Sequence, residues 1–185
     1  MNNSERFKIL VDSERTVFTP SDLRMLWQTN ALNAKVSTIR MTEKGLLARL
    51  SRGFYVLNNR YNRYELANRI LSPSYVSFHA ALFFAGVNFQ ACREIGSVAT
   101  RDYKKKVGDT LYAYAAMKKK LFFNAEGVVT RGNLSIALPE RAILDSYYFG
   151  YLPDIDHAEA LNKSFLEKLS VLYPQTVQEK IKGLL

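Results

Sequence analysis

The order of elements in the first 57 residues constrains the fold of this chain more than any other feature. Apolar residues at helical spacing predict three helices, over residues 4–11, 20–27 and 32–44. The segment GLLARLSRGFYVL (residues 45–57) then predicts a β-hairpin, because two short apolar runs flank a polar, glycine-containing turn. Three helices followed by a hairpin are the order of a winged helix-turn-helix, in which the hairpin is the wing.

The second of these helices has the clearest start. Thr19 supplies an N-cap hydroxyl, Pro20 suits the first helical position, and Asp22 adds an early carboxylate. On the third helix, apolar residues recur at intervals of four and three. We therefore expect Leu32, Val36 and Ile39 to face the core.

The rest of the chain predicts a second domain. Short polar turns separate the expected strands, which favours an antiparallel sheet with flanking helices. We predict an α+β fold with a winged helix-turn-helix domain in residues 1–70 and a second domain in residues 71–185, with the boundary between residues 60 and 75. The expected helices cover residues 64–71, 75–85, 139–147, 155–161 and 165–185, the last with a break at Pro174. The expected strands cover residues 94–100, 110–117, 120–124, 127–130 and 134–138.

Positive charge is concentrated in the first two thirds of the chain. The formal net charge is +9, of which residues 1–63 carry +6, residues 64–132 carry +5 and residues 133–185 carry −2. A basic surface favours polyanionic partners. On a winged helix, double-stranded DNA is the simplest such partner.

The third helix and the hairpin supply the candidate DNA contacts. In a winged helix, one helix lies in the major groove, where short polar side chains reach base edges and Lys or Arg hold phosphates. The alternative is a charged, solvated face on a winged helix used for protein contacts. We predict base contacts from Lys35, Ser37 and Thr38, and phosphate contacts from Lys44, Arg49 and Arg52.

Two lysine triplets lie in the second domain, where we expect them at turns of the sheet. They are Lys104-Lys105-Lys106 and Lys118-Lys119-Lys120. Adjacent ammonium groups raise the local potential enough to contact nucleic acid or an acidic partner. They are also typical of sheet edges and turns, where lysines block aggregation.

Patterns for catalysis are weak. The chain has no phosphate-cradling glycine loop, and two histidines with one cysteine cannot form the usual zinc site. Ser77 and His79 are expected on different faces of an apolar helix, and Asp145 is expected to fix a turn or a helix partner. The nearest metal-nuclease pattern combines Asp102-Tyr103-Lys104 with Glu94 upstream. We expect no enzymatic activity, no metal and no cofactor.

The sequence predicts a cytoplasmic protein without a membrane partner. Met1 to Leu10 is polar, without the apolar core of a signal peptide, and no stretch approaches the roughly 20 apolar residues that span a bilayer. Cys92 is a single cysteine, so it cannot form an internal disulfide and is expected to be an inert thiol.

Four ordered segments together resemble the AbiEi family of abortive-infection antitoxins. They are VFTPSDLRML (residues 17–26), GLLARLSRGFYVL (45–57), YELANRILSPSYVSFHAAL (64–82) and LSIALPERAILDSYYF (134–149). The resemblance covers about residues 16–185. It places Ser51, Arg52 and Gly53 in the wing. Ser51 and Gly53 therefore join Arg52 as candidate DNA contacts.

The resemblance implies a non-enzymatic antitoxin of a type IV toxin-antitoxin system involved in phage defence. Its winged helix would bind the promoter of its own operon and repress transcription. Because a single winged helix buries a limited DNA surface, two protomers on inverted repeats are one arrangement. Its second domain would counter an AbiEii-like nucleotidyltransferase toxin, with which such antitoxins need not form a stable complex.

Two other functions remain open from the residues. One is a stand-alone winged-helix transcriptional regulator whose second domain binds a ligand or a protein. The other is a defence nuclease built on the sheet, with Asp102 as its central carboxylate.

Overall fold

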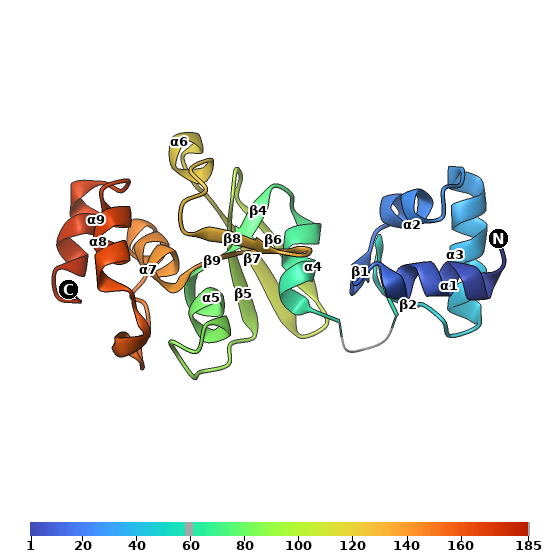
Figure 1. Cartoon of the computed structure of the whole chain (residues 1–185), viewed down its shortest axis with the longest axis horizontal. Helices are drawn as coiled ribbons and strands as arrows, with labels where there is room; N and C mark the ends of the chain where they lie inside the picture. Colours follow the sequence, from blue (N-terminus) through green and yellow to red (C-terminus); the bar gives the residue numbers. More distant parts are fainter. Residues whose placement is uncertain (58–60, 185) are drawn as a thin grey trace. The chain divides into compact units, whose positions relative to one another are not determined.

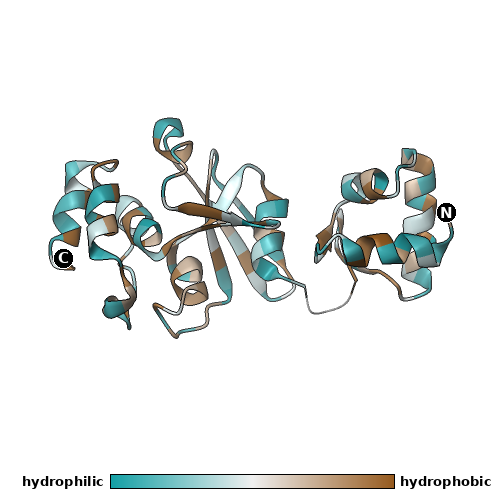
Figure 2. Cartoon of the chain, viewed as in Figure 1, coloured by the Kyte–Doolittle hydropathy of each residue, from teal (hydrophilic) through white to brown (hydrophobic). Residues whose placement is uncertain are grey.

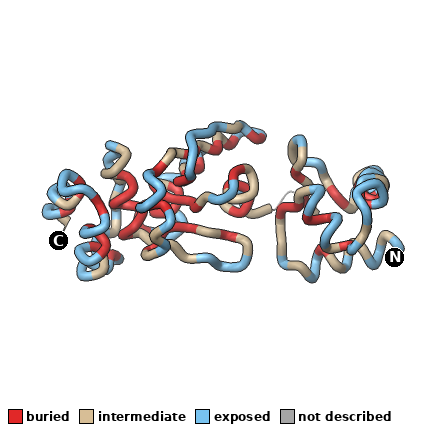
Figure 3. The backbone as a smooth tube through the Cα atoms, turned by 90° about the horizontal axis from the view of Figure 1, so that it is seen from above, coloured by how far each residue is buried: buried red, intermediate tan, exposed pale blue. Residues whose placement is uncertain are grey.

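The computed structural model describes residues 1–57 and 61–184, and the chain divides into two compact units, Met1–Arg69 and Ile70–Leu185 (Figure 1). Each unit contains its own buried residues, so each is described by itself (Figure 3). The described chain is α+β, as predicted. None of the helices in these two stretches combines the length and the apolar character needed to cross a bilayer.

In its described residues, the first unit combines helices with a three-stranded antiparallel sheet in the order β1-β3-β2. Val56 of the central strand pairs with Val17 on one side and with Ala48 on the other. The elements are α1 (Asn3–Asp12), β1 (Val17–Phe18), α2 (Pro20–Leu26), α3 (Ala31–Glu43), β2 (Ala48–Ser51), β3 (Phe54–Val56) and α4 (Arg63–Ile70).

Helix α2 begins at the predicted residue. The Thr19 hydroxyl accepts the N–H of Asp22, and the Asp22 carboxylate accepts the N–H of Thr19 in return, which satisfies two backbone donors. Asp22 Oδ1 also lies 2.6 Å from Arg15 and 3.3 Å from Arg69. This one carboxylate therefore joins the start of α2 to the chain before β1 and to α4.

The core of the first unit lies between its helices. Hydrophilic and hydrophobic residues both occur on α1, α2 and α3 (Figure 2). Hydrophobic residues of these helices form the buried cluster together with Phe18 of β1, Trp27 and Leu47. Its buried members are Leu10, Phe18, Leu23, Trp27, Ala34, Met41 and Leu47.

The second unit is built on a six-stranded sheet in the order β6-β7-β5-β4-β9-β8. The predicted antiparallel sheet is wrong, because β5 pairs with β7, and β4 pairs with β9, in parallel. The hairpin of β6 and β7 places β7 beside β5, so two strands running in the same direction become neighbours. The elements are β4 (Ser74–Val76), α5 (Phe78–Phe84), β5 (Glu94–Ala99), β6 (Tyr103–Val107), β7 (Thr110–Ala116), α6 (Lys119–Phe122), β8 (Val128–Arg131), β9 (Leu134–Ala137), α7 (Pro139–Tyr148), a 3₁₀ turn η1 (Ala158–Ala160), α8 (Lys163–Ser170) and α9 (Gln175–Ile181).

Four local expectations differ from the structure. The helix expected over residues 155–161 is only the 3₁₀ turn η1, Ala158–Ala160. The strand expected over residues 120–124 is instead the helical turn α6, which buries the adjacent side chains of Leu121 and Phe122 rather than alternate ones. The helix expected from Tyr75 begins only at Phe78, because the preceding residues join the sheet as β4. Strand β6 was not predicted, because its consecutive lysines lack the apolar alternation of a half-buried strand.

Helix α7 organises the helical part of the second unit. It begins at Pro139, as predicted, and it packs against α5, α8 and α9. Helix α5 packs in turn on β5. The sheet and these helices hold the two polar features of the unit, a cavity and a buried ionic cluster.

Candidate nucleic-acid interface

Helix α3 turns a different face to the core from the predicted one. We expected Leu32, Val36 and Ile39 to be buried, but Leu32 is 69% exposed and Ile39 48% exposed. Two stripes recur at helical spacing on this helix, and the core takes the one with the smaller side chains. The buried residues are Ala34, Ser37, Thr38 and Met41.

The expected orientation of Ser37 and Thr38 is therefore wrong. Both are buried, and the Thr38 hydroxyl donates to the carbonyl of Ala34 one turn earlier. The hydroxyl proton of Thr38 is therefore used within the helix. Lys35, the third predicted base contact, is exposed on the helix surface as expected.

A groove of about 650 Å³ lies between α2, α3 and the β2–β3 hairpin. Three exposed cations line it, Arg24 from α2, Lys35 from α3 and Arg49 from β2. No carboxylate is among the described residues that line the groove. The other lining residues are small, hydroxyl-bearing or apolar: Pro20, Ser21, Ala31, Ala34, Thr38, Ile39 and Tyr55.

The three groove cations differ from other cations of the same unit. Arg15 and Arg69 are paired with Asp22, whereas Arg24, Lys35 and Arg49 have no carboxylate partner among the described residues. Sequence reasoning missed Arg24, because it lies on α2 rather than on the helix expected to read DNA. Its signal was an arginine in the last turn of the helix that precedes the polar break.

The remaining predicted contacts lie near the same hairpin. Lys44 caps the end of α3 and is exposed, as is Arg52 at the tip of the hairpin. Ser51 is the last residue of β2 and is half-buried. Gly53 has a φ of +85°, a conformation that favours glycine and forms the turn into β3.

The lysine triplets lie in different kinds of structure. Lys104, Lys105 and Lys106 lie within β6, an edge strand of the sheet, and not at a turn as expected. Lys118 is the N-cap of α6, and Lys119 and Lys120 form its first turn. All but Lys105, which is half-buried, are exposed. The two triplets therefore present charge from separate elements of one unit.

The second unit contains a cavity of about 580 Å³. Its floor uses small residues of β5 and β7, with Gly96 paired to Ala113 in the sheet. Its walls come from the start of α5 and from residues 151–154 after α7. Of the predicted catalytic candidates, His79, Glu94, Asp102, Tyr103 and Lys104 all line it, as does Cys92.

The cavity has the chemistry of a binding pocket more than that of a metal centre. Among the described residues, no group of three or more His, Cys, Asp or Glu side chains is placed to hold a metal ion. His79 faces the backbone carbonyl of Gln90 through Nε2, and its Nδ1 lies 3.2 Å from the Asn88 amide nitrogen. The same Nδ1 lies 3.8 Å from Asp154 Oδ2, so both ring nitrogens face polar groups of the chain. Ser77 instead donates to Asp145, away from His79.

Phe78 closes one side of this cavity in a strained backbone conformation. Its φ is +55°, in the left-handed region that bulky residues rarely adopt. A Cβ on Gly96 would lie 2.7 Å from Phe78 Cδ2, so the ring occupies space that only glycine leaves free. The ring also packs edge-on against Phe149 and Tyr151, at 5.5 Å between centroids in each pair.

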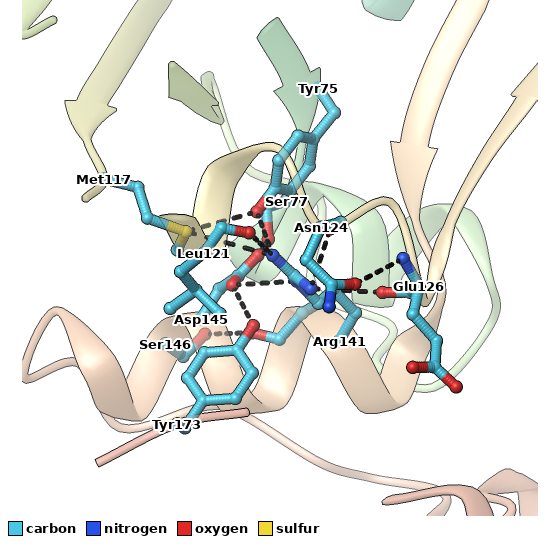
Figure 4. Close-up of polar contacts among 11 residues, drawn as sticks. Tyr75, Ser77, Met117, Leu121, Asn124, Glu126, Arg141, Asp145, Ser146 and Tyr173 are labelled. Carbon is cyan, nitrogen blue, oxygen red and sulfur yellow. Dashed lines mark hydrogen bonds and ion pairs between the residues drawn. The ribbon is translucent and has the colours of Figure 1, made fainter. Parts of the chain in front are cut away.

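A buried ionic cluster joins α7 to the chain around it (Figure 4). Asp145 accepts hydrogen bonds from Ser77 at 2.7 Å and from Tyr173 at 2.6 Å. Arg141 donates to the carbonyls of Leu121 at 3.0 Å and of Glu126 at 3.1 Å. Asp145 therefore fixes neighbouring elements, the role expected from the sequence.

Burial controls the ionisation of this cluster. It raises the pKa of the Asp145 carboxyl, although Arg141 and the Tyr173 and Ser77 hydroxyls act in the opposite direction. It also raises the pKa of Tyr75 and Tyr173 above the ordinary value for tyrosine, and the Asp145 charge adds to both shifts. The lack of exposure and the hydrogen bonds of both charged groups to neighbouring elements indicate a structural cluster.

Comparison with protein-family models gives no match for this chain, and no curated protein matches its sequence significantly.

Proposed function

We propose that this protein is a DNA-binding transcriptional autorepressor and the antitoxin of a type IV toxin-antitoxin system, and that it is not an enzyme. In this proposal the first unit is a winged helix-turn-helix domain that binds the promoter of its own operon. The second unit counters a nucleotidyltransferase-like toxin, without requiring a stable complex. The AbiEi resemblance is the source of the toxin assignment.

The groove of the first unit is the observation that carries the DNA-binding part. Cations from three different elements, Arg24, Lys35 and Arg49, surround one groove beside an exposed helix, and none has a carboxylate partner among the described residues. Unpaired cations on a groove wall can neutralise phosphates without first breaking an ion pair. Lys44 and Arg52 extend the same charge to the end of α3 and the hairpin tip.

A mobility-shift titration on the DNA immediately upstream of the gene tests this proposal. We expect binding to weaken steeply with salt, and each of Arg24→Ala, Lys35→Ala and Arg49→Ala to lower the salt slope by about one. Lys8→Ala, which removes an exposed lysine on α1, is the matched control and should leave the slope unchanged. Equal slopes for the groove variants and the control would remove the groove from the interface.

Growth rescue tests the antitoxin part separately. We expect the full chain to restore growth of cells that express the adjacent nucleotidyltransferase-like gene. The triple variant Arg24→Ala, Lys35→Ala, Arg49→Ala should lose repression and keep rescue, because the second unit is unchanged. A solitary gene with no such neighbour, or failure of the full chain to rescue, would contradict the antitoxin assignment.

The cavity in the second unit favours a second candidate function, a stand-alone regulator with a ligand-binding second domain. Its volume of about 580 Å³ lies within the range of small-molecule sites. Its small-residue floor gives a direct test, because Ala113→Leu and Ala115→Leu would fill it. A promoter reporter that no longer responds to growth conditions, with promoter affinity unchanged in vitro, would support this function. Unchanged regulation in both variants would contradict it.

A further inference from the structure

The exposed face of α3 carries an apolar stripe that the core does not use. Leu32 is 69% exposed, Ile39 is 48% exposed, and Val36 lies between them in half-buried form. These residues follow one another at spacings of four and three, so they lie on one side of the helix. Large aliphatic side chains in such a row on a surface indicate a contact with something apolar.

Charge on both sides of the stripe indicates what that partner is. Lys35 lies along one border and Arg40 along the other, and both are exposed. Arg24 of α2 and Arg49 of β2 line the same groove as Lys35 and Ile39. An apolar row bordered by cations complements a surface that is polyanionic at its edges and has apolar groups along its floor.

The major groove of DNA is such a surface where it contains thymine. Phosphates border the groove, and the C5-methyl group of thymine is its main apolar feature, read by aliphatic side chains. Leu32 and Ile39 are seven residues apart, which is about 10.5 Å along a helix. This matches three base-pair steps of about 3.4 Å each.

We propose that α3 recognises thymine methyl groups in the major groove through Leu32, Val36 and Ile39. The inference rests on the proposed DNA binding and adds its specificity: a target half-site with two or three thymines within four consecutive base pairs. The polar side chains predicted to read bases, Ser37 and Thr38, are buried, whereas Leu32 and Ile39 are exposed. Glu43 ends the stripe, which limits the contact to the first part of the helix.

The test compares thymine with uracil, which lacks only the methyl group. The full chain first selects its site from a random duplex library, and the selected duplex is then made with deoxyuridine in place of each thymidine in turn. We expect affinity to fall by about fourfold for each contacted methyl group, the factor for one buried CH₂-sized group. Thymidines outside the half-site should show no change.

Variants of the stripe then connect the effect to α3. Leu32→Ala and Ile39→Ala should reduce the thymine-to-uracil ratio towards one, and their exposure means that the fold tolerates them. Val11→Ala is the matched control, because Val11 is 50% exposed on α1. Lys35→Ala should weaken both duplexes equally.

The outcomes separate this inference from the proposed function. Failure to select or bind any duplex contradicts the proposed function itself. Tight, salt-dependent binding with equal affinity for thymine and uracil duplexes overturns only the thymine inference. Loss of self-association in Leu32→Ala, with the thymine preference unchanged, would also overturn it and assign the stripe to a second copy of this chain.

Discussion

Arg141 and Asp145 form an ion pair one turn apart on α7, with 3.4 Å between Nε and Oδ1 and with both side chains fully buried. Two charges removed from water in this way stabilise the fold only while each is compensated. Here Arg141 also donates to the carbonyl of Leu121 in α6, and Asp145 also accepts hydrogen bonds from Ser77 and Tyr173. The pair therefore fixes α7 against elements that are distant in the sequence.

Removing one partner of this pair should be costly. Asp145→Ala leaves Arg141 buried without its counter-charge, and we expect the free energy of unfolding to fall by about 3–5 kcal/mol. Tyr173→Phe removes one hydrogen bond to the same carboxylate and should cost about 1.5–3 kcal/mol. Urea unfolding followed by circular dichroism measures both. A loss below about 1 kcal/mol for Asp145→Ala would contradict the structural role.

Gly96 should not tolerate a side chain while Phe78 keeps its position. Alanine at this site would place a Cβ 2.7 Å from the Phe78 ring, and we expect a loss of about 1–3 kcal/mol in the free energy of unfolding. The loss should be largely absent in the Phe78→Ala background, because the opposing ring is then gone. Gly183→Ala is the control, since no atom lies within 4 Å of that added Cβ. Additive effects of Gly96→Ala and Phe78→Ala would contradict the predicted clash.

Features set by contacts between near neighbours in the sequence could be predicted, and features set by contacts between distant elements could not. The start of α2 was predictable, because Thr19 and Asp22 satisfy each other within one turn. The buried face of α3 was not, because Leu32-Val36-Ile39 and Ala34-Thr38-Met41 have the same period. The shape of the space beside Trp27 and Leu47 selects the second stripe, and that space is formed by other elements.

The site predictions divide in the same way. Lys35, Arg49 and Arg52 are exposed at the groove or hairpin, because local polarity and turn chemistry place them. Arg24 was missed because its position beside Arg49 depends on how α2 packs against the hairpin. The parallel pairing of β5 with β7 is likewise non-local, since the strand between them in sequence lies at the sheet edge.

Alkaline pH should destabilise the fold through its buried tyrosines. Burial raises the pKa of Tyr75, Tyr114 and Tyr173 in the folded chain, whereas in the unfolded chain the value is about 10. Above that pH the unfolded state loses phenolic protons that the folded state keeps. The free energy of unfolding should therefore fall as the pH rises above about 10. The fall should be about 1.4 kcal/mol per pH unit for each such tyrosine.

Melting temperatures from pH 8 to 11, with tyrosinate absorbance recorded in parallel, measure this effect. The three buried tyrosines should form tyrosinate only when the chain unfolds. Tyr173→Phe should be less stable near neutral pH yet show a shallower decline above pH of about 10, because one linked proton is gone. A decline as steep as that of the unmodified chain would contradict the assignment of Tyr173.

The lysines of β6 should protect an open sheet edge. Lys104 and Lys106 are exposed on an edge strand, where unpaired backbone groups can pair with another chain, and charged side chains oppose that pairing. We expect Lys104→Val with Lys106→Val to cause concentration-dependent association, measured by sedimentation and light scattering. Lys118→Val with Lys120→Val removes the same charge from α6 and should leave the chain dispersed.

If both pairs of changes caused equal association, loss of net charge rather than edge exposure would be the cause. If only the α6 changes weakened binding to the promoter duplex, that triplet would join the DNA interface and the β6 triplet would keep its protective role.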